Sequence, residues 1–139
     1  MHRCRRMCSR TSGYSAMKLL LDTHAFLWWD SNDAHLPDAL RSAIASPRNQ
    51  VFVSAVTVWE IAIKRASGKL IFGKPVGKAI EEHDFLPLPI TVEQAECAGA
   101  LPQAHRDPFD RLLVAQAQLE GLVLVTVDEQ ILRYQVPHL

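Results

Sequence analysis

The sequence predicts an α/β fold with a central, mainly parallel sheet. Short apolar runs alternate along the 139 residues with longer amphipathic segments of helical spacing. One run, residues 122–127, is almost continuously apolar, which is typical of a strand buried on both faces of a sheet. Strands that alternate with helices form parallel sheets, because each helix carries the chain back to the same end of the sheet.

The strands and helices follow from local signals. Strands are predicted at residues 18–21, 51–54, 86–90 and 122–127. The third contains Pro87 and Pro89, which donate no hydrogen bond to a neighbouring strand, so we expect it to be short or at an edge. Helices are predicted at residues 24–29, 37–45, 56–66, 75–83, 92–101, 108–120 and 128–134. Pro108 suits the first helical position and Gly121 suits a helix end.

The chain divides into two unequal parts. Residues 1–16 contain four arginines and no acid, whereas residues 17–139 contain 11 basic and 15 acidic residues. We expect residues 1–16 to be a disordered extension, with a nucleic-acid-binding arm as the alternative, and residues 17–139 to be the functional domain, beginning at Met17. The extension lacks the apolar core of a secretory signal, and no apolar run approaches the roughly 18 residues of a membrane-spanning helix. We therefore expect a cytoplasmic protein without a membrane partner.

Two acids each follow a predicted strand directly. Asp22 follows the run KLLL, and Asp128 follows LVLVTV, in which Thr126 adds a hydroxyl. Each can serve as the N-cap of the next helix, since Asp is among the best capping residues. Ligands of parallel α/β sheets bind beyond the carboxyl ends of the strands, so the same two acids are candidates for a functional site.

Two further acids lie in predicted helices. Glu60 has apolar neighbours and can either form an ion pair with Lys64, four residues on, or point into a cleft. Asp110 is the third residue of a helix that Asp107 caps, and the helix dipole stabilises an acid at that position. It can face the same crevice as the strand ends.

Taken together, the four acids predict a metal site. Carboxylates that share a cleft repel one another, and a hard divalent cation removes that conflict. Oxygen ligands without His or Cys suit Mg²⁺ or Mn²⁺. Such a cation activates a bound water and neutralises phosphate, which predicts phosphodiester hydrolysis.

Four stretches carry a family resemblance: LLLDTHAFLWW, SAVTVWEIAIKRASGKL, HRDPFDRLLVAQAQLEG and LVTVD. Together they resemble the PIN domain, specifically the VapC-type toxins of bacterial toxin–antitoxin pairs, over residues 17–139. The resemblance implies a three-layer α/β/α PIN-like domain and an Mg²⁺- or Mn²⁺-dependent endoribonuclease that acts on RNA. On the family pattern the acidic metal-site and catalytic positions are Asp22, Glu60, Asp110 and Asp128.

The resemblance also implies supporting residues and partners. Thr23 and Thr126 match polar positions beside the acids, and Arg111 either contacts phosphate or pairs with a neighbouring acid. Members of the family form homodimers and are inhibited by a small VapB-like antitoxin whose tail lies in a groove beside the acids. In the run FLWW we expect at least two side chains in the core, and the candidates for a partner or dimer surface are Phe26, Trp28 and Trp29.

Other functions fit the sequence less well than a ribonuclease. A haloacid-dehalogenase-like phosphatase requires a second Asp where His24 stands, and a receiver domain requires a phospho-accepting Asp that the run VFVSAV lacks. Two alternatives stay open on the sequence: a PIN ribonuclease of RNA processing without an antitoxin, and a non-enzymatic α/β binding module whose acids only cap helices.

Overall fold

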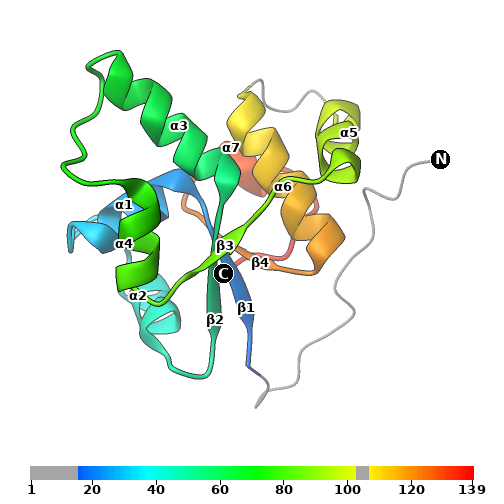
Figure 1. The fold of residues 1–139 in the computed structure, drawn as a ribbon. Coiled ribbons are helices and arrows are strands. Elements are labelled where there is room, and N and C mark those ends of the chain that lie inside the picture. Colours follow the sequence, from blue (N-terminus) through cyan, green and yellow to red (C-terminus); the bar gives the residue numbers. More distant parts are fainter. Residues whose placement is uncertain (1–15, 103–106) are drawn as a thin grey trace.

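The centre of the molecule is a parallel sheet with helices on both faces (Figure 1). The computed structural model describes residues 16–102 and 107–139. Within them the strands are β1 (Lys18–Leu21), β2 (Gln50–Ser54), β3 (Leu86–Leu88) and β4 (Val123–Val125), in the order β3-β2-β1-β4. The helices are α1 (Thr23–Asp30), α2 (Asp38–Ala45), α3 (Ala55–Ala66), α4 (Val76–Glu82), α5 (Val92–Ala100), α6 (Pro108–Glu120) and α7 (Glu129–Leu132).

Every predicted strand and helix has its counterpart among the described residues, and two strands are shorter than predicted. β3 has three residues and lies at an edge of the sheet, as its prolines predict. β4 ends at Val125, so Thr126 and Val127 form the connection to α7 instead of extending the strand. The predicted extension falls outside the described residues except for Ala16.

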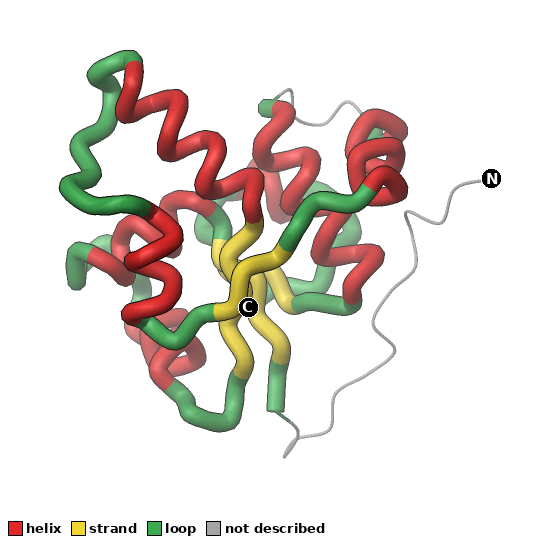
Figure 2. The backbone as a smooth tube through the Cα atoms, in the orientation of Figure 1, coloured by secondary structure: helices red, strands yellow, loops and turns green. Residues whose placement is uncertain are grey.

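The sheet is filled on both sides by alternate residues of the same strands. On one side, Leu19 and Leu21 of β1 pack in a core with α1, α2 and α4. On the other side, Leu20 packs with α6 and α7. All three leucines are 0% exposed, as expected of a central strand covered on both faces. Figure 2 shows the strands between these two groups of helices, which confirms the predicted three-layer α/β/α fold.

The strand order determines where a site can form. β1 pairs with β2 on one side and with β4 on the other, so the strand order reverses at β1. The backbone N–H of Asp22 donates to the carbonyl of Val125 at 3.1 Å and extends the β1–β4 pairing by one step. The carboxyl ends of β1 and β4 therefore open side by side at a switch point of the sheet. Among the described residues, no helix has the length and apolar character needed to cross a lipid bilayer.

Candidate active site

Asp22 stands at the carboxyl end of β1 and is only 4% exposed. It is the N-cap of α1, and its carboxylate accepts a hydrogen bond from the backbone N–H of Ala25 at 2.8 Å. The Thr126 hydroxyl, which follows β4, lies near enough to lower the pKa of this carboxylate. The capping role and the position at the strand ends are thus both present in one residue.

Glu60 is also 4% exposed, although it lies on a helix. The Thr23 hydroxyl donates to its Oε1 at 2.7 Å, and the Lys64 ammonium donates to its Oε2 at 2.6 Å. Thr23 lies in turn 3.2 Å from the hydroxyl of Thr57. The ion pair with Lys64 and the position inside a cleft, which the sequence leaves as alternatives, are both found.

The other two acids lie at helix starts. Asp128 caps α7 and accepts from the N–H of Gln130 at 2.9 Å, while its own N–H donates to Thr126 Oγ1 at 3.0 Å. Asp110 is in the first turn of α6, which begins at Pro108 after the N-cap Asp107. The helix dipoles therefore place partial positive charge near both carboxylates.

These acids line one cavity of about 120 Å³ at the carboxyl end of the sheet. Its lining consists of Asp22, Thr23, His24, Glu60, Lys64, Asp107, Asp110 and Asp128. All four predicted acids are therefore brought together by the fold from positions far apart in the sequence. The lining holds five carboxylates and one ammonium group.

The electrostatics of the cavity follow from burial. Burial raises the pKa of Asp22, and the nearby Asp128 charge adds to this, whereas hydrogen bonds from Thr126 and Ala25 and the His24 ring oppose it. The hydrogen bond to Glu60 raises the pKa of Lys64, and the charges of Asp107 and Asp110 act in the same direction. The cavity thus has a deficit of positive charge.

We tested whether these residues suit a metal ion. Within residues 16–102 and 107–139, no three Asp, Glu, His or Cys side chains stand close enough together to hold one ion. The carboxylates are instead hydrogen-bonded to backbone N–H groups, to threonines and to Lys64. The donor set and the buried charge of Asp22 nevertheless suit a hard divalent cation, which favours oxygen ligands. The chemistry of the lining residues therefore fits such an ion.

The supporting threonines and Arg111 behave differently. Thr23 donates to Glu60, and Thr126 accepts from the backbone N–H of Asp128. Arg111 is 8% exposed, and its guanidinium donates to carbonyls at the end of α5, among them Ala98 at 3.1 Å and Leu101 at 2.8 Å. These contacts hold the guanidinium against the end of α5, and the two alternatives for Arg111, a phosphate contact or a pair with a neighbouring acid, stay predictions. Arg111 joins the start of α6, which carries Asp110, to the end of α5.

The predicted partner surface needs one correction. Phe26 is 0% exposed and its ring lies 6.3 Å from that of Phe72 and 6.5 Å from that of Phe85, so it belongs to the core and not to a surface. Its position on α1 turns it toward the sheet. Trp28 and Trp29 are only half-buried and remain candidates.

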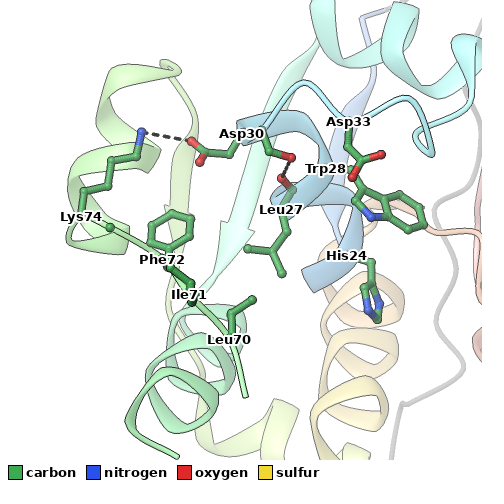
Figure 3. A pocket seen from close by; sticks show the side chains of 11 residues that line it. His24, Leu27, Trp28, Asp30, Asp33, Leu70, Ile71, Phe72 and Lys74 are labelled. Atoms are coloured by element: carbon green, nitrogen blue, oxygen red, sulfur yellow. Dashed lines mark hydrogen bonds and ion pairs between the residues drawn. The ribbon is translucent and has the colours of Figure 1, made fainter. Parts of the chain in front are cut away.

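A second, larger hollow of about 660 Å³ lies beside α1 (Figure 3). We call it the α1 groove. On one side it is lined by residues of α1 and the turn after it, including Leu27 and Trp28, and on the other by residues 70–74 after α3. Ile71 is 93% exposed there. His24 lines both the α1 groove and the acid cavity, so the two hollows meet at this residue.

The cavity also holds residues that the sequence did not assign to the site. The sequence predicts Asp107 as an N-cap; it does cap α6, through the N–H of Phe109 at 2.9 Å, and it also lines the cavity. Its position three residues before Asp110 indicates that both side chains lie at the start of the same helix. Lys64 could be found from its spacing of four residues from Glu60.

Comparisons with known proteins agree on one family. A family model described as PIN domain matches residues 19–137. The chain is 30% identical over 122 residues to Ribonuclease VapC22 of Mycobacterium tuberculosis, a match that covers 86% of this chain and 93% of that protein. Its fold is similar to a chain in the crystal structure of VapBC2 from Rickettsia felis bound to a DNA fragment from their promoter. That match has a TM-score of 0.62 at 14% identity and covers 88% of this chain and 98% of the other.

Proposed function

The chain belongs to the PIN domain family and is of the VapC type, and from that premise we propose that it is the endoribonuclease toxin of a toxin–antitoxin pair. The observation that carries this proposal is the acid cavity, in which five carboxylates from separate parts of the chain line one small space at the strand ends. Helix capping does not account for Glu60, which lies in the middle of α3 and yet lines the same cavity. The relative named a ribonuclease supports the activity.

In this proposal the ligands of Mg²⁺ or Mn²⁺ are Asp22, Glu60, Asp110 and Asp128. The cation, when bound, activates a water and neutralises charge on the RNA phosphate. Thr23 orients Glu60 through the hydrogen bond to Oε1, and Thr126 orients Asp22 and supports the backbone of Asp128. Such hydrogen bonds hold ligands in the geometry that the metal requires.

The test is cleavage of single-stranded RNA by the purified protein with Mg²⁺, with Mn²⁺ and with EDTA. We expect cleavage with either cation, with 5′-phosphate ends, and none in EDTA. Full activity in EDTA would rule out the metal mechanism. If protein freed of any partner cleaves no RNA with either cation, the proposed ribonuclease activity is wrong.

The partner proposal rests on the α1 groove. We propose that a VapB-like antitoxin lays apolar side chains into it and reaches the acid cavity at His24, where the hollows meet. The similar Rickettsia felis structure is of a VapBC2 assembly, which supports a partner of this kind. A homodimer of the chain completes the proposed assembly, and light scattering of the purified protein tests that part.

The domain limits are a further proposal. We propose that residues 17–139 are the functional nuclease and that residues 1–16 contribute nothing to it. A protein that begins at Met17 is then expected to cleave RNA at the same rate and with the same metal requirement as the full chain. A loss of activity on truncation would assign the arginines of residues 1–16 a role in RNA binding.

A further inference from the structure

Lys64 contributes an ammonium group to the described lining of the acid cavity. Its ammonium lies 2.6 Å from Glu60 Oε2, and it is one of the residues that line the cavity. Because the two residues are four apart on α3, the helix itself holds the pair together. The charges of Asp107 and Asp110 also act on this ammonium.

The pair differs from an ordinary ion pair on a helix surface. The side chain of Glu60 is 6% exposed, whereas that of Lys64 is 42% exposed. An exposed pair at this spacing contributes only a few tenths of a kcal/mol, since water screens both charges. A buried carboxylate, in contrast, needs a partner, because water cannot solvate it.

The two oxygens of Glu60 have unlike partners. Oε1 accepts from the hydroxyl of Thr23, a buried side chain with little freedom to move. Oε2 accepts from Lys64, whose four-carbon side chain is partly in solvent and can swing away. A cation that approaches Glu60 from the cavity therefore competes with Lys64 for Oε2, while Thr23 keeps its hold on Oε1.

We propose that Lys64 is a built-in counter-cation of the metal site: it neutralises Glu60 while no metal is bound and is displaced when a divalent cation takes Oε2. The inference rests on the proposed function, since it assumes that the acids bind a metal. Lys64 is a positioning residue in this account. It stabilises the folded protein while no metal is bound, and it lowers the affinity of the site for the metal.

The test is titration of the full chain with Mn²⁺ by isothermal calorimetry, in wild type, Lys64→Met, Lys64→Arg and Lys69→Met. Lys64→Met removes the competing charge, so we expect Mn²⁺ to bind about tenfold more tightly, the size expected for loss of one charge-assisted hydrogen bond. Lys64→Arg keeps the charge and is expected to stay near wild type. Lys69→Met, which removes a charge that does not line the cavity, is the matched control and is expected to change nothing.

Melting curves distinguish this role from a merely structural one. We expect metal-free Lys64→Met to melt below wild type, because Glu60 loses its partner, and to gain more than wild type from added Mn²⁺. A structural role alone would lower the melting temperature without strengthening Mn²⁺ binding. If Lys64→Met does not fold, Lys64→Gln, which is polar but uncharged, carries the same expectations.

The outcomes separate the two proposals. If the wild type binds no Mn²⁺, the metal mechanism of the proposed function fails. If the wild type binds Mn²⁺ and the uncharged variants bind it equally or more weakly, the proposed function stands and the role of Lys64 is overturned.

Discussion

The two hollows that meet at His24 differ in nearly every respect. The acid cavity measures about 120 Å³ and is lined by five carboxylates, an ammonium, a hydroxyl and the His24 ring. The α1 groove measures about 660 Å³, and its lining includes Leu27, Trp28 and Ile71. The first is held by hydrogen bonds at strand ends and helix caps, and the second is formed by side chains of α1 and a loop.

The contrast shows that size does not identify the chemistry. The large groove offers apolar surface, which suits association with a protein partner. The small cavity gathers carboxylates, and buried carboxylates require a cation or a proton. The proposed function therefore places catalysis at the cavity and partner binding at the groove, and substitutions in the two hollows are expected to separate these roles.

The largest effect is expected from removing a charge of the cavity. Asp110→Asn deletes a proposed metal ligand, and RNA cleavage is expected to fall by more than about a hundredfold, since even loss of a residue behind the ligands costs 10–100-fold. Rates at saturating Mg²⁺ measure this. Asp38→Asn, an exposed acid at the start of α2, is the control and is expected to cleave like wild type. Cleavage by Asp110→Asn at the wild-type rate would remove this acid from the site.

A smaller effect is expected from the hydroxyl that holds Glu60. Thr23→Val keeps the shape but removes the donor to Oε1, so cleavage is expected to fall about tenfold or more. The circular dichroism spectrum is expected to stay that of wild type. Equal rates in the variant and wild type would show that Thr23 does not orient the ligand.

A substitution in the groove is expected to change partner binding and to leave RNA cleavage unchanged. Ile71→Glu places a charge on its apolar wall and is expected to weaken binding of the antitoxin about tenfold, while RNA cleavage without partner is unchanged. Val92→Glu, at an apolar residue 81% exposed and outside the groove, is the matched control. Binding by calorimetry and cleavage rates are the two measurements. Unchanged affinity in Ile71→Glu would place the partner elsewhere.

The smallest effect concerns stability and pH. Burial raises the pKa of Asp22 above 3.8, so the folded state holds this proton more tightly than the unfolded state. Below pH 3.8 the carboxyl is neutral in both states; as the pH rises through the folded-state pKa, the ionised form costs stability. Asp22→Asn keeps a good N-cap without that charge, so in EDTA its melting temperature is expected to exceed that of wild type increasingly from acidic to neutral pH. Parallel melting temperatures across this range would contradict a raised pKa of Asp22 in the folded state.

The sequence predicts the site well where position along an element decides the outcome. Asp22 and Asp128 follow strands, and parallel strands end at the same edge, so their approach follows from topology alone. The place of Asp110 in the first turn of α6 follows from Pro108, which predicts where that helix begins. β4 stops short of its predicted end because Thr126 and Val127 already turn toward α7, and hydropathy does not mark that turn.

The sequence fails where rotation about a helix decides the outcome. Phe26 and Trp28 belong to one short apolar run, yet Phe26 enters the core and Trp28 lines the groove. Arg111 follows a site acid directly, and the helical turn carries its side chain away toward the end of α5. For Glu60, helical spacing predicts the partner Lys64 but not the burial, which depends on the packing of α3 over the strand ends.

The most direct test of the central claim, that the carboxylates of the small cavity form one metal site, is Mn²⁺ titration of the double variant Asp22→Asn/Asp128→Asn against wild type. The two residues follow different strands, and both line the cavity. We predict that wild type binds Mn²⁺ and that the folded double variant loses this binding. Equal Mn²⁺ affinity in the two proteins would contradict the account.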